Sequence, residues 1–567
     1  MIVKRASPFL YGLAALLAVF VYFYGLESQY IPKNGDEYPY EHITRLTAHA
    51  GHLLPLQSQL EAMRDTKPPL LFWQGIAWTD WGDAWDLWHL RFPSVVYTLL
   101  TGLMVMLLAR RLSGRTDTGL VALLTYLAFF STYRYGRPFL ANPPEVFWMT
   151  APLFAMVSWP RATFDSRFAI PVAIGLALGV DMLYKSFALL APAGLTLAWW
   201  YLHQRRYDWR AFLARDASRL AIIAIVALAV FALWFALDPD PQSVWREFVV
   251  RENIGKFGAH GGGYFTTLLW GGSSLWALLV GYPMNAGLLA VPVAALMWAA
   301  YRRRREMRDA EKMLWMLVIV LLAVFAVPSQ RSARYLLEGM PALAVLFALG
   351  WERIGRWAFL VSLALAGAAL ALLAFLALHL QQADGGALYA GGYWVLLALA
   401  AAVVAAGLAL PRLTRPFLLV ATLLVYLAFA AFLRPFDGAP GNYDAQALQA
   451  VQGRMVWTPC DFRAKDEGHR FLLPGARISG YYQAPALTPD ELARQHRLFA
   501  VQLPLQDKVA CAGCTVLGSR LEIRGRQNGA EIRDMLHGNV FPHLFVREWL
   551  VESATAPADP PAEQVCR

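Results

Sequence analysis

The feature that most restricts the fold is a series of apolar runs of about 16 to 25 residues, each long enough to cross a hydrocarbon core of about 30 Å. The first, Phe9 to Leu26, follows Lys4 and Arg5 and lacks a small-residue cleavage motif, so we interpret it as a retained helix. Further runs lie near residues 92–109, 119–133, 144–160, 168–184, 186–202, 218–237, 275–300, 313–328, 335–352, 357–379, 389–410 and 416–434. The pattern predicts a polytopic α-helical membrane protein with about 13 transmembrane helices.

The composition agrees with this class. Hydrophobic residues make up 57% of the 567 residues and charged residues only 16%, against about 45–50% and about 25% in soluble proteins. The net charge of +10 lies mostly in short loops between apolar runs, where membrane topology accounts for it. We therefore expect membrane lipids, and no nucleic acid, as partners.

The distribution of arginines predicts the topology, because cytoplasmic loops retain Lys and Arg. Alternate loops carry the arginine clusters, and we assign these loops and the N-terminus to the cytoplasm: Arg110, Arg111, Arg115, Arg161, Arg167, Arg205, Arg206, Arg210, Arg215, Arg302 to Arg305, Arg353, Arg356, Arg412 and Arg415. The opposite, external side then receives the loops 27–90 and 238–274 and the chain after about Arg434. We expect a transmembrane domain at residues 1–435 and a soluble external domain at residues 436–567.

The cysteines support an external C-terminal domain. All of them lie in this tail: Cys460, Cys511, Cys514 and Cys566. This favours an oxidising compartment and two disulfides of unspecified pairing, although the Cys511-Cys514 spacing also suits a redox pair or half a metal site. Strand-like runs alternate with short helical ones, so we predict a small α/β domain without a catalytic constellation.

The first external loop contains chemistry that a linker does not need. Asp36, Glu37 and Glu41 follow the first helix, and Lys67 precedes two prolines and bulky apolar residues suited to the headgroup level. Amphipathic stretches between them can lie in the membrane interface. A solvated surface turn is the plain alternative for the acidic pair.

Other external turns place cations where the topology disfavours them. These are Arg137, Lys185, Arg331 and Arg334, each beside aromatic residues at a membrane edge. Together with the Lys67 turn they make four agreeing turns, which suggest a local anion such as the phosphate of a lipid substrate, whereas a single cation can snorkel to ordinary headgroups. The external segment from Trp245 to Tyr264 adds an amphipathic stretch and a glycine run after His260.

Several short motifs occur in a recognisable order. They are the acidic pair, Lys67-Pro68-Pro69-Leu70, Arg91-Phe92-Pro93-Ser94, Arg137-Pro138-Phe139, Glu252-Asn253 with downstream His260, and Arg334-Tyr335 before Pro341. This order over residues 1–435 resembles the bacterial aminoarabinose transferases of the protein mannosyltransferase superfamily, which have the C-type (GT-C) membrane glycosyltransferase fold. One departure concerns the second acidic residue of many relatives, because Asn142 stands at that position and Glu145 follows it.

The resemblance implies a function and assigns roles to residues. It implies transfer of an aminoarabinose-like sugar from a polyprenyl (undecaprenyl) phosphate donor to lipid A or another lipid or glycan acceptor, by a monomer in a bacterial inner membrane. Asp36, with Glu37 beside it, falls at the reacting centre. The implied donor-phosphate ligands are Lys67, Arg137, Lys185, Arg331 and Arg334, and further substrate contacts are Glu145, Asn142, Asn253, His260 and Tyr335.

The expected chemistry is a single displacement that inverts the anomeric centre, with Asp36 as base for a hydroxyl acceptor or as an orienting group for a phosphate acceptor. No cofactor is implied with certainty. The residues Glu41, His42, His49, His52 and His260 form no recognised metal cluster, and divalent metal dependence stays open. The alternatives are a protein O-mannosyltransferase-like or other glycan transferase, and a transporter, for which midplane charges and internal repeats are lacking.

Overall fold

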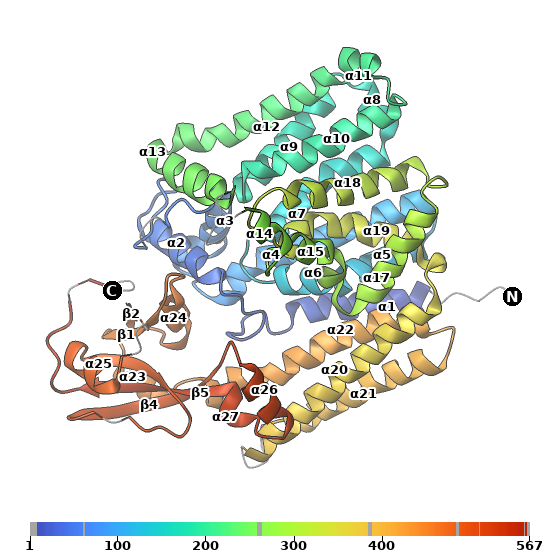
Figure 1. Cartoon of the computed structure of the whole chain (residues 1–567). Helices are drawn as coiled ribbons and strands as arrows, with labels where there is room; N and C mark the ends of the chain where they lie inside the picture. Colours follow the sequence, from blue (N-terminus) through green and yellow to red (C-terminus); the bar gives the residue numbers. More distant parts are fainter. Residues whose placement is uncertain are drawn as a thin grey trace.

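The protein is described by a computed structural model that covers residues 8–60, 63–257, 264–383, 388–482, 487–509, 511–560 and 562–563. His260 and Cys566 lie outside the described residues. A large body of helices carries a small strand-containing unit at one end (Figure 1).

Six segments of the described chain are long and apolar enough to cross a membrane. They comprise α4 (Leu87–Ser113), α12 (Ala217–Leu237), α16 (Gly281–Ala286) continued by η5 (Gly287–Leu289) and α17 (Ala290–Arg302), α20 (Arg356–Ala383), α21 (Gly391–Ala409) and α22 (Thr414–Leu433). Shorter apolar helices are α1 (Pro8–Phe23), α5 (Thr116–Ala128) and α9 (Ala169–Tyr184). The prediction of a polytopic helical membrane protein is confirmed.

Several predicted runs are broken helices, so the number thirteen stays a prediction. The run 119–133 divides at Phe129, whose extended backbone separates α5 from α6 (Phe130–Tyr135). The run 335–352 is η6 (Ala333–Gly339) followed by α19 (Met340–Leu349). The chain turns at Gly287, which has a φ of +62°. A Cβ at this position would lie too close to the Cβ of Phe130, so no side chain fits there.

The remaining helices of the body are shorter or carry more charge at their ends. They are α7 (Asn142–Ser158), α8 (Pro160–Asp165), η2 (Phe187–Leu189), α10 (Leu190–Gln204), α11 (Trp209–Arg215), α18 (Asp309–Ala326) and η7 (Trp351–Arg353). The arginine-bearing α8 and α11 lie at the end of the body away from α2 (Glu37–His49) and from the strands (Figure 1).

The two long loops after α1 and α12 contain short helices instead of flexible linker. The first holds α2, α3 (Leu70–Trp78) and η1 (Asp80–Gly82), and the second holds α13 (Pro241–Ser243), the π-helix η3 (Val244–Asn253), η4 (Ile254–Phe257), α14 (Tyr264–Leu269) and α15 (Leu275–Leu279). Ten of the 13 residues of α2 are buried, polar and charged ones as well as apolar ones, so the helix is covered on several sides. The expected amphipathic segments are therefore ordered elements.

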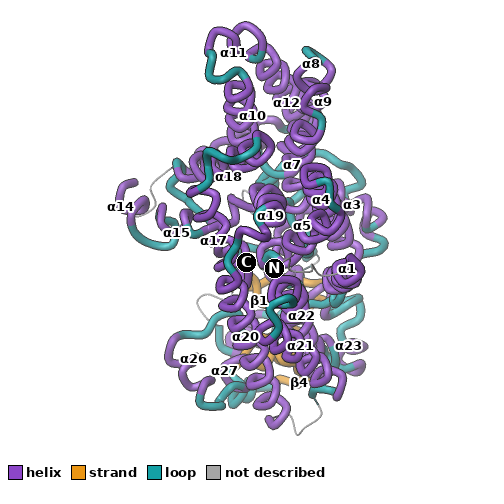
Figure 2. The backbone as a smooth tube through the Cα atoms, turned by 90° about the vertical axis from the view of Figure 1, so that its right-hand side faces the viewer, coloured by secondary structure: helices purple, strands orange, loops and turns teal. Residues whose placement is uncertain are grey.

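The C-terminal unit is a five-stranded mixed sheet with short helices, as the predicted α/β composition requires. Its elements are η8 (Arg434–Asp437), η9 (Ala439–Gly441), α23 (Ala445–Ala450), β1 (Met455–Cys460), η10 (Lys465–Glu467), α24 (Gly468–Leu472), β2 (Arg477–Tyr482), α25 (Pro489–Gln495), β3 (Leu498–Leu503), β4 (Cys514–Ile523), α26 (Gly529–Leu536), α27 (Phe541–Leu544) and β5 (Phe545–Ser553). The strand order is β2-β1-β3-β5-β4, with β2, β1 and β3 parallel and β5 antiparallel to both neighbours. Figure 2 shows the strands near α20 to α23, with α26 and α27 beside them.

Candidate functional site

Asp36 stands at the N-terminal end of α2, directly before Glu37. Its side chain makes no capping bond to the helix and is 35% exposed. The loop before it is fixed instead by Asn34, whose Oδ1 accepts a hydrogen bond from the Asp36 backbone N–H at 3.1 Å. The Asp36 carboxylate is thus held at a helix terminus, where the positive end of the helix dipole favours its charge, and stays accessible.

Arg334, at the start of η6, joins Asp36 to α7. Its Nη1 donates to Asp36 Oδ2, and its Nε and Nη2 donate to Asn142 Oδ1 at 3.0 and 2.6 Å. The guanidinium also lies 4.8 Å above the ring of Tyr135. Three contacts therefore fix one arginine, 298 residues away in sequence, against the acidic turn.

Lys185, just after α9, faces two carboxylates. Its Nζ lies 2.6 and 2.7 Å from the two oxygens of Glu145 and 3.5 Å from Glu338 Oε1. Asn142 Nδ2 donates to Glu145 at 3.0 Å, which links this cluster to Arg334. Glu145 and Glu338 are both wholly buried, and neither Glu338 oxygen accepts a hydrogen bond within the described part of the chain.

The C-terminal end of η3 connects Lys67 to the same cluster. Lys67 Nζ donates to Glu252 Oε1 at 2.7 Å, and the neighbouring Asn253 accepts a hydrogen bond from Ser186 Oγ at 2.6 Å. Ser186 follows Lys185 directly. We call this set the polar chain; its contacts are joined through the sequence neighbours Lys185–Ser186 and Glu252–Asn253, and its members are Asp36, Arg334, Asn142, Glu145, Lys185, Ser186, Asn253, Glu252 and Lys67.

Glu37 lies outside the polar chain. It is 2% exposed, and its carboxylate receives two hydrogen bonds from Arg91, at 2.8 and 3.0 Å, and one from the Phe139 N–H at 2.8 Å. Arg91 also donates to the carbonyls of Leu26 and Ser28. The acidic pair of the sequence thus divides into an accessible carboxylate and a buried anchor that ties α2 to α4, to the segment after α1 and to the segment before α7.

Arg137 and Arg331 also bind the protein itself. Arg137 is fully buried and donates to the carbonyls of Tyr22 and Tyr24 at the end of α1. Arg331 is 3% exposed and donates to carbonyls including Ala326 O, at 2.7 Å. Both arginines donate hydrogen bonds to carbonyls that helix ends leave without a partner inside the helix. This role differs from the predicted phosphate binding. The remaining predicted contact, Tyr335, packs on Phe325 with ring centroids 5.3 Å apart.

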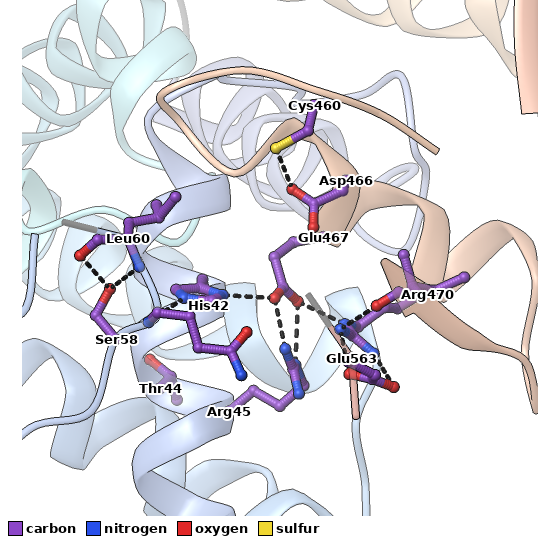
Figure 3. A network of polar contacts seen from close by, with 12 residues as sticks. His42, Thr44, Arg45, Ser58, Leu60, Cys460, Asp466, Glu467, Arg470 and Glu563 are labelled. Carbon is purple, nitrogen blue, oxygen red and sulfur yellow. Dashed lines mark hydrogen bonds and ion pairs between the residues drawn. The ribbon is translucent and has the colours of Figure 1, made fainter. Parts of the chain in front are cut away.

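The C-terminal unit docks on α2 through a buried ionic network (Figure 3). Glu467 lies at its centre and contacts His42 Nδ1 at 2.7 Å, Arg45 at 2.6 and 3.1 Å, and Arg470 Nε at 2.9 Å. His42 Nε2 accepts the Gln59 N–H at 3.1 Å, so the ring fits a neutral tautomer that donates from Nδ1. Burial raises the pKa of Glu467, but Arg45 and Arg470 outweigh it and hold the pKa well below its usual range.

The same unit reaches the polar chain directly. Arg463, in the turn after β1, lies with Nη1 3.7 Å from Asp36 Oδ1. Asp36 is therefore flanked by Arg334 from the membrane helices and by Arg463 from the C-terminal unit.

The cysteines form disulfides. Cys511 is bonded to Cys514, and Cys460 is disulfide-bonded too. Within the described ranges there is no group of three or more His, Cys, Asp or Glu side chains arranged to hold a metal ion.

Comparison with known proteins identifies the fold. Residues 13–240 match the family described as dolichyl-phosphate-mannose-protein mannosyltransferase. Over 98% of its length, the chain superposes on the whole crystal structure of ArnT from Cupriavidus metallidurans bound to undecaprenyl phosphate, with a TM-score of 0.62 and 19% identity. This chain has the GT-C fold of ArnT. The apo ArnT structure gives a TM-score of 0.60.

The sequence relatives agree with the resemblance found from the motifs. The chain is 26% identical to an undecaprenyl phosphate-aminoarabinose arabinosyl transferase of Proteus mirabilis over 61% of this chain and 60% of that protein. It is 31% identical to the corresponding Pseudomonas aeruginosa protein (strain UCBPP-PA14) over 52% and 53% of the two chains. These matches cover less than two thirds of the relatives' length.

Three members of the site do not follow from the sequence patterns alone. Glu338 lies in the apolar run 335–352, and its position four residues after Arg334 is its only signal. Glu252 belongs to the Glu252-Asn253 motif, which assigns it no role. Arg463 and its approach to Asp36 had no signal, because the contact joins two units that are distant in sequence.

Proposed function

We propose that this chain is an integral membrane glycosyltransferase that moves an aminoarabinose-like sugar from a polyprenyl phosphate donor to lipid A or another envelope acceptor. The observation that carries the proposal is the polar chain, which combines two partly exposed carboxylates, Asp36 and Glu252, with three cations beside membrane helices. The similarity to arabinosyl transferases that use an undecaprenyl phosphate donor supports it.

The cations of the polar chain would bind the donor phosphate. Breaking the anomeric C–O bond through an oxocarbenium-like state leaves a phosphate monoester with more negative charge. Lys67, Lys185 and Arg334 are 15%, 19% and 23% exposed, so their charges are partly desolvated and strong. Their present carboxylate partners keep these cations in position.

The buried carboxylates favour an amino sugar. Glu145 and Glu338 face a single cation, Lys185, so this corner has a surplus of acidic groups. A protonated sugar amine would supply the missing charge and hydrogen-bond donors. Glu145 and Glu338 thereby take the place of the acidic residue that Asn142 replaces.

Asp36 would act at the reacting centre. A hydroxyl acceptor requires a base, and the Asp36 carboxylate is accessible, whereas Glu37 beside it is buried. A phosphate acceptor is already anionic, and Asp36 would then orient the sugar. Attack in a single displacement gives inversion, with Glu37 holding the turn from behind.

The proposal includes the topology. Residues 1–435 form the transmembrane domain of an inner-membrane monomer, and residues 436–567 form a periplasmic domain. The separation of α8 and α11 from α2 and the strands supports it (Figure 1), as do the disulfides. A C-terminal reporter active only in the cytoplasm would contradict it.

The decisive experiment is mass spectrometry of envelope lipids and glycans from cells that lack the gene, complemented with wild-type or Asp36→Asn protein. We expect a sugar mass that only the wild type restores. Loss of a sugar from lipid A identifies that acceptor, and an unchanged envelope in all strains would contradict a transferase.

The protein O-mannosyltransferase-like reaction is the second candidate, because residues 13–240 match that family. A neutral hexose would gain nothing from the Glu145–Glu338 corner. Glu338→Gln should therefore raise the donor KM for an amino sugar and leave the donor KM for a neutral sugar unchanged. Transfer of a hexose to proteins by the wild type would favour the second candidate.

A further inference from the structure

A cavity of about 820 Å³ lies between the membrane helices and the C-terminal unit, apart from the polar chain. Its walls come from α20 and α22, from the segment 30–38 that leads into α2, and from the turns around β3, β4 and β5. Figure 1 shows the C-terminal unit against the ends of α20 to α22. The cavity is therefore a junction between the two parts of the protein.

The wall formed by the membrane helices is apolar. Leu376 of α20 and Phe429, Phe432 and Leu433 of α22 line it, together with Phe436. Phe432 is 5% exposed and faces the interior, whereas Phe429 is 45% exposed on the outer surface of α22. An apolar wall that continues onto the outer surface of a membrane helix suits a hydrocarbon chain entering from the bilayer.

The wall formed by the C-terminal unit is basic. The cations lining the cavity exceed the carboxylates lining it by three, and these groups are Lys33, Arg463, Lys465, Arg524 and Arg526 against Asp461 and Glu522. Lys33 pairs with Glu522 at 3.0 Å, and Arg524 pairs with Glu531 at 2.9 Å. The remaining cations are Arg463, Lys465 and Arg526, and the carboxylates beside them are Asp461 in the lining and Asp36, 3.7 Å from Arg463 Nη1, so cations still outnumber carboxylates. Such a concentration of cations attracts a phosphate-like anion.

The basic wall ends beside Asp36. Gly35 lines the cavity, and Arg463 Nη1 lies 3.7 Å from Asp36 Oδ1. A Cβ at position 35 would lie 3.6 Å from Arg463 Nη1, an ordinary van der Waals contact, so Arg463 lies directly against this turn. Asp36 thus has the polar chain on the Arg334 side and this cavity on the Arg463 side.

We propose that this cavity is the acceptor site and takes a lipid with a phosphate headgroup, bound through Arg463, Lys465 and Arg526 with its chains along α22. The inference rests on the proposed function and assigns the acceptor to a site of its own. In the step it serves, an acceptor phosphate oxygen bonds to the anomeric carbon while the donor C–O bond breaks, and the electron pair leaves on the donor phosphate. Arg463 is a positioning residue that brings the acceptor headgroup to Asp36.

The first test measures binding without turnover. The full-length protein is titrated in detergent with dioleoyl phosphatidic acid, and native mass spectrometry records the bound lipid. We expect the triple variant Arg463→Gln/Lys465→Gln/Arg526→Gln to bind at least tenfold more weakly than wild type, with unchanged binding of undecaprenyl phosphate. The control variant Arg494→Gln/Arg497→Gln/Arg533→Gln removes the same charge from exposed positions of the C-terminal unit that do not line the cavity.

Three results would overturn the proposal. Equal affinity of the triple and control variants would remove the basic wall from lipid binding. Equal affinity for dioleoyl phosphatidylcholine would reduce the site to apolar contact. Full competition by millimolar inorganic phosphate would leave a free-phosphate site with no role for the lipid chains. The single variant Arg526→Gln, at an exposed position, gives the same comparison if the triple variant is unstable.

The second test separates this proposal from the proposed function. Where transfer to a lipid acceptor is measured, the triple variant should raise the acceptor KM at least tenfold and leave the donor KM unchanged. An increased donor KM, or a lower kcat with both KM values unchanged, would contradict an acceptor site. If no transfer occurs with wild type, the proposed function fails, while the lipid-binding result still stands or falls by itself.

Discussion

The buried carboxylate of Glu467 should hold the C-terminal unit on α2, and we predict that Glu467→Gln loosens this docking. Glu467 is 1% exposed and contacts Arg45 and Arg470 as well as His42. The Gln variant keeps the shape but leaves Arg45, 6% exposed, without its carboxylate partner. Removing one partner of a buried ion pair costs about 3–5 kcal/mol.

Limited proteolysis measures this change. When detachment and docking are fast relative to cleavage, the cleavage rate follows the population of the detached form. A loss of about 4 kcal/mol corresponds to about a thousandfold larger population, since about 1.4 kcal/mol is a factor of ten. We therefore expect cleavage between α22 and β1 to accelerate by about two to three orders of magnitude.

Glu563→Gln is the matched control. Glu563 also pairs with Arg470, at 2.9 Å, but its side chain is 25% exposed and Arg470 retains Glu467. Its loss should cost about 1 kcal/mol or less. Similar cleavage of Glu467→Gln and wild type would refute the reasoning, because the network would then contribute nothing to docking.

Three further predictions follow from the same contacts. Asp36→Asn should lower kcat about 10²- to 10⁴-fold with an unchanged melting curve. Glu37→Gln should instead destabilise the protein by about 3–5 kcal/mol, because Arg91 stays buried without its carboxylate partner. The reverse pattern of kcat and melting temperature would exchange the roles of the two residues. Burial raises the pKa of Glu522, but Lys33 and Arg520 outweigh it and lower the pKa to about 2. Docking of the C-terminal unit should therefore weaken as pH falls from 4.5 toward 2. If proteolysis of Glu522→Gln accelerated in acid as much as that of the wild type, this assignment would be contradicted. Replacing both Cys511 and Cys514 by Ser should cost about 2 kcal/mol, because the closed loop is short, and an unchanged thermal unfolding of the C-terminal unit would contradict it.

The separation of Asp36 from Glu37 shows where local sequence stops being informative. Both are carboxylates at one helix start, and their neighbours are the same. The difference arises from Arg91 and the Phe139 N–H, which meet Glu37, and from Arg334 and Arg463, which meet Asp36. No spacing rule gives these contacts, because they depend on how α4, η6 and the C-terminal unit pack around α2.

The four external cations divide in the same way. The sequence predicts that all four lie on the external side, against the positive-inside trend, and Lys185 and Arg334 do lie in the polar chain. Arg137 and Arg331 instead donate to carbonyls at helix ends. Unpaired carbonyls and substrate phosphates attract the same guanidinium, so composition alone predicts a site for a negative partial charge without specifying which one.

The sequence by itself determined the membrane class, the helical body with a C-terminal α/β unit, the external acidic turn and the resemblance to lipid-phosphate transferases. These depend on apolar run length, charge distribution and motif order, which are properties of the chain read along its length. The tertiary structure alone decided which carboxylate is accessible, that Glu338 completes the Lys185 corner, and that Arg463 approaches Asp36. These depend on helix packing and domain docking, because burial and long-range ion pairs exist only once distant segments meet.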